Sequence, residues 1–221
     1  PYTSIHHKIV SESKGLKRRF EDFQVTLEKF CAKNASVVIA TSRKVREGLI
    51  SAGVSADKIF LVPNGVDTQT FRQDSEKATQ IRRKFDLMKN EVVLYVGRIV
   101  KYKGLDYLVD SAPKIIEKHP NVKFVIAGPV SYYSTNIPTP YYRALKNKIE
   151  SEKLSEYFIF TGAVNDEDLI GLYSACDLFI LPSLSEGFGI VLVEAMSCGK
   201  PVIGSKIGGI IDVINDGEDG Y

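Results

Sequence analysis

The stretch DLFILPSLSEGFGIVLVEAMSCGKPVIG, residues 177–204, carries the pattern that indicates the fold. Its apolar run at 177–181 predicts a strand, residues 188–198 predict a helix, and residues 201–204 predict a second strand. Both strand segments are continuous apolar runs without the alternation of a half-exposed strand, so helices are expected to cover both of their faces. Strands and helices that alternate in this way form a parallel, doubly wound α/β sheet.

The same alternation continues upstream of this stretch. Apolar runs predict further strands at 92–97, 122–127 and 157–161, and helical patterns lie at 105–118, about 141–152 and 166–175. The long loop at 128–140 is rich in Pro and Tyr and is interpreted as a plain insertion or a lid. This regular alternation is therefore predicted to form one doubly wound domain. The chain stops just after a turn, where such a pattern would continue, so we expect this domain to be truncated at its C-terminal end.

The first 71 residues contain a further set of predicted elements. Apolar positions three and four residues apart indicate an amphipathic helix, and short apolar runs indicate strands on either side of a second helix. These elements are expected at 16–33 (helix), 36–42 (strand), 43–52 (helix) and within 58–67, where a strand runs into a Pro-Asn-Gly turn. The chain begins at Pro1 without an initiator Met, so we expect it to be part of a longer protein.

Charge is small overall and unevenly distributed. The net charge of +2 does not suggest nucleic-acid binding, but residues 1–90 hold 17 basic and 10 acidic side chains while residues 91–221 hold 12 and 17. The basic excess is densest at Lys14, Lys17, Arg18 and Arg19, beside Phe20 and Phe23. This cluster is interpreted either as a solvated helix face or as a contact for an anionic surface, such as a membrane that carries a lipid acceptor.

Composition excludes several other classes of protein. With 44% hydrophobic and 25% charged residues the chain is typical of a folded domain, and no apolar run approaches the roughly 20 residues of a spanning helix. Cys31, Cys176 and Cys198 lie far apart without CxxC spacing, which favours neither a disulfide framework nor a zinc site. They are interpreted as small buried side chains in a reducing compartment, so a cytoplasmic protein is expected.

The segments that follow the predicted strands are suited to bind an anion. In open parallel sheets, ligands bind beyond the carboxyl ends of the strands. A diphosphate is bound by positive charge and by backbone N–H donors, which cations and helix N-termini that follow glycines supply together. Each cation considered by itself would be an ordinary surface residue. These segments contain Gly97, Arg98, Lys103 and Gly104 after the strand at 92–97, and the glycine-bearing stretches 161–164, 182–189 and 205–209 after the later strands.

Glu194 is a carboxylate in a helix that is otherwise apolar, GIVLVEAMSCG, and that is therefore expected to be buried. A buried ionised carboxylate without a partner costs several kcal/mol. Its partner is either structural, a lysine or backbone amides, or a bound diol, because a carboxylate accepts hydrogen bonds from two adjacent hydroxyls such as those of a ribose.

Together these segments resemble glycosyltransferase family 4, whose members are retaining, nucleotide-sugar-dependent enzymes of GT-B fold. Glu186 and Glu194 have the spacing of the family's E-x7-E motif, and Gly97-Arg98 with Lys103-Gly104 resembles its GR…KG segment. Pro63-Asn64-Gly65-Val66-Asp67 resembles the segment before the interdomain linker. The resemblance implies that residues 72–221 are the Rossmann-like donor domain. Residues 1–71 would then be the tail of a second Rossmann-like domain, the acceptor domain, together with the linker.

The resemblance also implies roles for individual residues. Gly97, Arg98 and Lys103 would bind the donor diphosphate, and Glu194 the ribose hydroxyls. The backbone near Gly162 and Val164 would hold the base. Glu186, Gly187 and the amides of Phe188 and Gly189 would bind the transferred sugar, and Glu186, Arg98 and Lys103 would act in catalysis. His6 occupies the place of a histidine near the acceptor, but the next residue is His7 where the family has Asp, and a surface histidine is the alternative.

The implied reaction moves a sugar from a nucleoside-diphosphate sugar to an acceptor hydroxyl with retention at the anomeric carbon. No cofactor or metal is implied, and the sequence offers no Asp-x-Asp pair for a divalent cation. The acceptor is open: a sugar, a lipid-linked molecule or a small molecule. A sugar-nucleotide epimerase and a non-catalytic nucleotide-sugar binding module are the alternatives. Because most of the acceptor domain would be absent, these 221 residues alone are expected to be inactive.

Overall fold

The computed structural model describes residues 16–131 and 137–221, with side chains from Phe23 onward. His6 and the basic cluster at 14–19 lie outside the described side chains, as does the middle of the loop 128–140. The contacts of the chain define two compact units. The larger comprises Gly65–Leu184, Ile190–Ser205 and Ile214–Tyr221, and the smaller comprises the chain up to Asn64 with residues 185–189 and 206–213. The domain boundary predicted at residue 71 stays a prediction.

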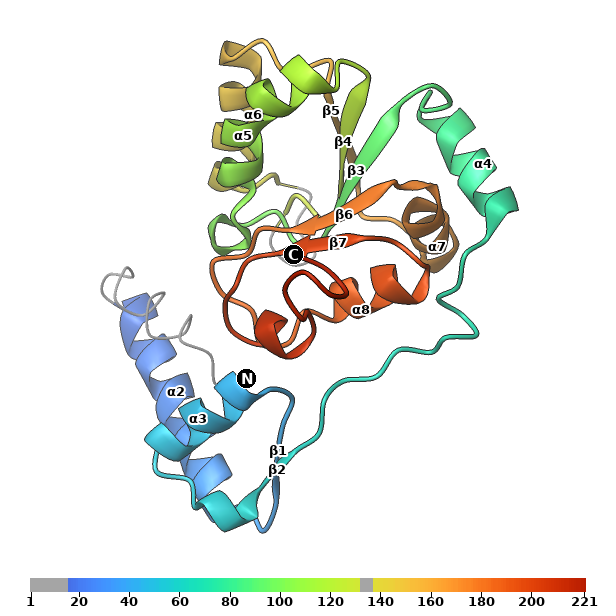
Figure 1. Ribbon diagram of the computed structural model, residues 1–221. Coiled ribbons are helices and arrows are strands. Elements are labelled where there is room, and N and C mark those ends of the chain that lie inside the picture. The colour runs from blue at the N-terminus through green and yellow to red at the C-terminus, as the bar shows by residue number, and fades with distance from the viewer. Residues whose placement is uncertain (1–15, 132–136) are drawn as a thin grey trace. The chain divides into compact units, whose positions relative to one another are not determined.

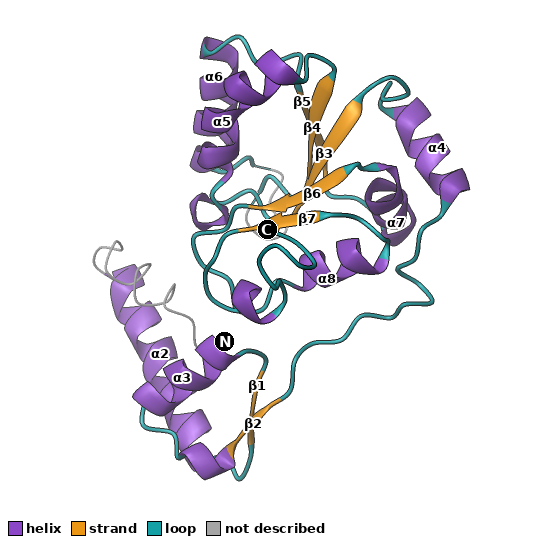
Figure 2. Cartoon of the chain, viewed as in Figure 1, coloured by secondary structure: helices purple, strands orange, loops and turns teal. Residues whose placement is uncertain are grey.

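The larger unit contains the parallel sheet that the sequence predicts. Among the described residues its strands have the order β5-β4-β3-β6-β7, and every neighbouring pair is parallel (Figures 1 and 2). The order reverses at β3, which pairs with β4 on one side and β6 on the other. Such a reversal is where open α/β sheets bind ligands. The strands are β3 (Glu91–Val96), β4 (Val122–Ala127), β5 (Phe158–Gly162), β6 (Leu178–Leu181) and β7 (Val202–Gly204).

Helices lie on both faces of this sheet, as the apolar strands predict. Figure 1 shows α5 and α6 on one side and α4 and α7 on the other. Side chains cap several of these helices at the N-terminus: Asp74 caps α4, Thr139 caps α6 and Asn165 caps α7, each by accepting from a backbone N–H of the first turn. The helices are α4 (Ser75–Lys84), α5 (Leu105–Lys118), α6 (Pro140–Ser151), α7 (Asp166–Ala175) and α8 (Ile190–Ser197).

The core of the larger unit is formed by the central strands and the helix faces that pack on them. β3 and β4 are buried along most of their length, whereas side chains of the edge strands β5 and β7 are mostly half-buried or exposed. Fully buried large side chains include Tyr95, Phe124, Phe179, Leu94, Leu105, Leu108, Ile126 and Tyr173.

Helix α8 differs from the expectation in two respects. It begins at Ile190 and not at residue 188, because Gly189 has φ +92°, a left-handed conformation that an α-helix does not continue. It is also not buried on all sides: Leu192 and Ala195 are buried, and the other residues of α8, Glu194 included, are half-buried. One face of α8 packs against β6 and β7, and its uniformly apolar sequence does not show which face that is.

The smaller unit contains two helices and a parallel pair of strands. β1 (Val38–Ala40) pairs with β2 (Ile59–Leu61), and α2 (Leu16–Asn34) and α3 (Arg43–Ser51) precede and follow β1 along the chain. Ala40, Leu49, Val54 and Ile59 form its core. Both strands are shorter than the predicted ranges. Residues 62–67 belong to no helix, strand or turn, so the Pro-Asn-Gly turn expected there is wrong, and the turn of this segment lies at 68–70. The short parallel pair fits the predicted tail of a second Rossmann-like domain.

In the part of the chain that the structure describes, no helix has both the length and the apolar character needed to cross a membrane.

Candidate functional site

Glycines at the carboxyl ends of β3, β4 and β5 bring three backbone segments together. The Gly97 N–H donates to Ala127 O at 2.9 Å, and the Gly128 N–H donates to Gly162 O at 2.9 Å. A Cβ atom on Gly128 would lie 2.0 Å from Gly97 O, so no other residue fits at position 128 without moving the β3 segment. Gly128 was not among the expected site residues, because in the sequence it is only the first residue of a long loop.

Arg98 and Lys103 follow β3, as expected, and the structure places both beside the ring of Tyr102. The Arg98 guanidinium donates a hydrogen bond to the Tyr102 hydroxyl, and its Cζ lies 5.8 Å from the ring centroid. Lys103 Nζ lies 6.0 Å from the same centroid. Tyr95 donates from its hydroxyl to Arg98 O at 2.9 Å and so holds the backbone of Arg98. Two cations therefore share one aromatic ring at the strand end, within the range of cation–π attraction.

The segment after β3 also packs closely against the segment after β6. Gly104 has φ +70°, and a Cβ atom there would lie 1.9 Å from Pro182 O. The Leu184 N–H donates to Tyr102 O at 2.8 Å. The segment that carries Arg98 and Lys103 is thus fixed to the chain that leaves β6, at the point where the strand order reverses.

Glu194 lies on α8 and accepts a hydrogen bond from Tyr173 of α7, with 2.6 Å between the Tyr173 Oη and Glu194 Oε2 atoms. Burial raises the pKa of Glu194 above its ordinary value, and the Tyr173 hydrogen bond opposes this rise. Of the two alternatives for this carboxylate, the structural one named a lysine or backbone amides, whereas the structural partner found here is the phenol of Tyr173. Tyr173 lies 21 residues away in sequence, and its apolar surroundings gave no indication of this pairing.

Glu186 lies in the segment 185–189, which belongs by its contacts to the smaller unit. The Gly209 N–H donates to Glu186 O at 3.0 Å, and a Cβ atom on Gly208 would lie 2.1 Å from the same oxygen. Phe188 is buried. The glycines at 208 and 209 thus allow the chain after β7 to approach the backbone of this segment, which orders the amides at Gly187–Gly189.

Gly162 and Val164 lie at the end of β5. Gly162 has φ +73°, and a Cβ atom there would find nothing within 4 Å. Val164 is half-buried. The space on the Cβ side of Gly162 is therefore open.

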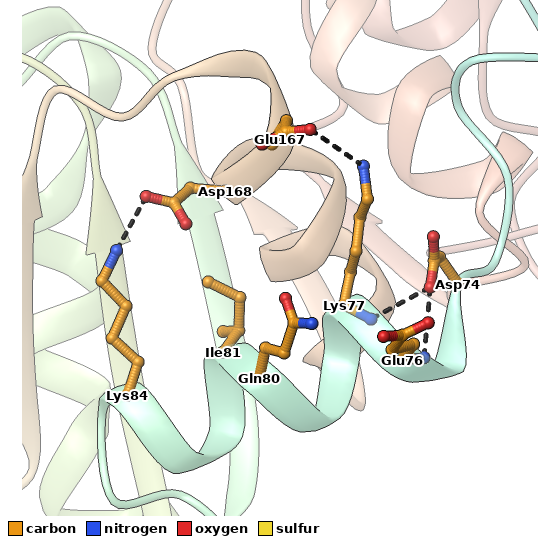
Figure 3. Close-up of a pocket in the computed structure, with 8 residues that line it drawn as sticks. All are labelled: Asp74, Glu76, Lys77, Gln80, Ile81, Lys84, Glu167 and Asp168. Carbon is orange, nitrogen blue, oxygen red and sulfur yellow. Dashed lines mark hydrogen bonds and ion pairs between the residues drawn. The ribbon is translucent and has the colours of Figure 1, made fainter.

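A surface groove of about 390 Å³ lies between α4 and α7, away from these residues (Figure 3). Two ion pairs cross it, Lys77–Glu167 at 4.0 Å and Lys84–Asp168 at 2.8 Å. Four of its charged side chains thus pair with one another, and none of its lining residues is an expected site residue. Within residues 16–131 and 137–221, no three His, Cys, Asp or Glu side chains gather as metal ligands.

Two family descriptions match the chain in sequence. Residues 77–221 match the family described as Glycosyl transferases group 1, and residues 2–70 match Glycosyltransferase Family 4. The parallel-sheet, Rossmann-like α/β fold of the larger unit matches the solved structures of GT-B glycosyltransferases. The chain belongs to the Glycosyl transferases group 1 family.

Individual relatives agree with this assignment. An uncharacterised glycosyltransferase of Methanocaldococcus jannaschii is 31% identical over 219 residues, which cover 97% of this chain and 54% of that protein. The D-inositol 3-phosphate glycosyltransferase of Acidothermus cellulolyticus is 34% identical, covering 84% of this chain and 43% of that protein. Anabaena HepE, solved in complex with UDP-glucose, has a TM-score of 0.80 at 28% identity, covering 93% of this chain and 54% of HepE. The chain thus spans about half the length of these relatives.

Proposed function

We propose that the protein transfers a sugar from a nucleoside-diphosphate sugar to an acceptor hydroxyl, with retention at the anomeric carbon. The observation that carries this proposal is the pair of cations, Arg98 and Lys103, beside Tyr102 at the glycine-lined strand end. Solved neighbours support it, since HepE was crystallised with UDP and with UDP-glucose. Names of relatives include a GDP-mannose-dependent mannosyltransferase of Mycolicibacterium smegmatis.

In this proposal Arg98 and Lys103 bind the donor diphosphate and stabilise the negative charge that develops on it as it leaves. Such preorganised electrostatic stabilisation is usually the largest single contribution to catalysis. The row of glycines lets backbone approach the phosphates closely, and the Gly97 segment is held by the Tyr95 and Ala127 contacts before any ligand arrives.

The remaining donor contacts are proposed as the resemblance to the family implies them. Glu194 accepts from the ribose hydroxyls, and the backbone at Gly162 and Val164 holds the base. Glu186, with the amides of Gly187–Gly189, contacts the transferred sugar. His6 is proposed on the acceptor side.

Neither a cofactor nor a metal ion is part of this proposal, because the two cations would supply the charge that a divalent ion supplies elsewhere. The acceptor is a sugar, a lipid-linked molecule or a small molecule, and the protein is proposed to act in the cytoplasm or at the membrane surface. Since the chain spans about half of its relatives, the 221 residues by themselves are expected to bind nucleotide without transferring sugar.

Calorimetric titration with UDP, GDP and ADP tests the proposal and selects the base. Arg98→Ala is expected to weaken binding of the selected diphosphate by about 1.5–3 kcal/mol, the range for hydrogen bonds to charged groups, and to weaken the matching nucleoside much less. Arg83→Ala, which removes an exposed arginine of α4, is the matched control and should leave both affinities unchanged. Equal losses for diphosphate and nucleoside in Arg98→Ala would refute the diphosphate role.

A further inference from the structure

We propose that Tyr173 is a positioning residue for the donor site: its phenol holds one oxygen of Glu194, so that the other oxygen is directed to the ribose hydroxyls. The inference rests on the proposed function, because it assumes that Glu194 binds the ribose. It adds a residue that the motif carrying Glu194 does not contain.

The first support is the geometry of the pair. Tyr173 Oη and Glu194 Oε2 are 2.6 Å apart, the short separation of a hydroxyl that donates to a carboxylate. Tyr173 is 0% exposed, so water does not compete for its hydroxyl. Its contact is with Oε2, whereas no hydrogen bond to Oε1 is found within the described residues.

The second support is the rigidity of the Tyr173 ring. Phe179 of β6 lies 5.7 Å from it, and Phe71, in the segment that leads into α4, packs edge-on at 6.1 Å. A ring held on two sides keeps its hydroxyl in place. A glutamate side chain has three rotatable bonds, and fixing it costs conformational entropy unless a partner has already ordered it. Tyr173 therefore orders Glu194 before the donor binds.

The third support is electrostatic. Burial disfavours the charged form of Glu194, and the Tyr173 hydroxyl favours it. Of the other groups near the pair, Cys176 and Cys198 have pKa values raised by burial to about 12 and about 11 and are neutral thiols at pH 7. The ammonium of Lys200 donates to Ser174 O at 2.8 Å. Burial and the negative charge of Glu194 raise the pKa of Tyr173, so its hydroxyl remains a donor throughout the ordinary pH range.

The test compares UDP with 2′-deoxy-UDP (or the GDP pair, if the protein selects guanine) by calorimetry from pH 5.5 to 8.5. Wild type should prefer the ribonucleotide. Tyr173→Phe keeps the ring and removes the hydroxyl, so it should weaken ribonucleotide binding about three- to tenfold, the value of one hydrogen bond, and reduce the preference over 2′-deoxy-UDP. It should also move the acid limb of the binding profile to higher pH, because the pKa of Glu194 rises further without the hydrogen bond from the Tyr173 hydroxyl. Tyr173→Phe in a Glu194→Gln background should lose nothing more.

Tyr141→Phe is the matched control, since Tyr141 of α6 also donates to a carboxylate, Asp106 Oδ2 of α5 at 2.9 Å. Figure 1 shows α5 and α6 on the other side of the sheet from α7. It should change neither the preference nor the pH profile.

The other possible outcomes distinguish the ribose role of Glu194 from the positioning role of Tyr173. If wild type binds UDP and 2′-deoxy-UDP equally, the ribose role of Glu194 is wrong and the inference fails with it. If Glu194→Gln abolishes the preference but Tyr173→Phe keeps both the preference and the wild-type pH profile, only the role of Tyr173 is wrong. An equal loss for both nucleotides in Tyr173→Phe would indicate a structural role and also overturn it. If Tyr173→Phe does not fold, 3-fluorotyrosine is placed at position 173. Its more acidic hydroxyl donates a stronger hydrogen bond to Glu194, so the acid limb of the binding profile should move to lower pH.

Discussion

Replacing Gly104 by alanine tests how closely the segments after β3 and β6 approach one another. Gly104 has φ +70° and ψ +21°, and a Cβ atom there would lie 1.9 Å from Pro182 O and 3.0 Å from Pro182 C. Ordinary contacts of this kind are about 3.5 Å, so one backbone segment must move by more than about 1 Å. The obstacle is main chain and cannot rotate away as a side chain would.

The expected cost has two parts. A left-handed conformation costs about 1–2 kcal/mol for any residue with a Cβ atom. The overpacking that pushes the two segments apart adds about 1–3 kcal/mol. This cost includes the expected loss of the hydrogen bond from the Leu184 N–H to Tyr102 O. Gly104→Ala should therefore lower the free energy of unfolding by about 2–5 kcal/mol. It should also weaken UDP or GDP binding in whatever fraction stays folded, because Lys103 is its chain neighbour.

Gly199→Ala is the matched control. Gly199 also has φ +70°, but a Cβ atom there would meet nothing within 4 Å, so the variant should show only the conformational cost of about 1–2 kcal/mol. Urea unfolding of both variants measures the difference. If Gly104→Ala loses no more stability than Gly199→Ala, the two segments do not approach as closely as the structure shows, and the argument for a fixed cation-bearing segment fails.

Three further predictions concern the carboxylates and metal dependence. Glu194→Gln should leave the ligand-free protein as stable as the wild type at pH 7, or slightly more stable. The raised pKa of Glu194 means that its ionisation lowers the stability of the wild type as pH rises. Any gain should vanish below about pH 4, where glutamate is protonated in the unfolded chain too. Urea unfolding at pH 4 and pH 7 measures this, and a loss above roughly 3 kcal/mol would identify Glu194 as a structural ion-pair partner. Glu186→Gln should weaken UDP-glucose more than UDP in calorimetry, and an equal effect on both would remove Glu186 from the sugar. Sugar transfer by the full-length enzyme should survive EDTA, and a loss of rate that Mn²⁺ or Mg²⁺ restores would contradict charge stabilisation by Arg98 and Lys103.

The elements of the larger unit could be predicted closely from the sequence because each follows from local patterns. The helix expected at 105–118 has the bounds of α5, and the strand expected at 122–127 has those of β4. Apolar runs bounded by glycine and polar residues report burial on both faces directly, and burial on both faces requires a parallel sheet with helices on either side. Strand order is not a local property, so the placement of β3 between β4 and β6 came from the structure.

Helix α8 shows where the local pattern misled. A helix with apolar residues around its whole circumference is predicted to be buried all round, but only the face with Leu192 and Ala195 is buried. Periodicity reports burial only where polar residues mark the exposed side, and here Glu194 is the one charged residue on the helix.

For the candidate site, the sequence alone determined which charged residues are informative: Arg98 and Lys103 follow a predicted strand, and Glu194 is a carboxylate in an otherwise apolar helix. The tertiary structure decided their partners, Tyr102 beside both cations and Tyr173 on the carboxylate. It also decided the close approach of Gly128 to Gly97. The reason is physical: charge and apolarity are properties of single residues that sequence displays, whereas a hydrogen bond or a backbone contact depends on distances between segments that only packing brings together.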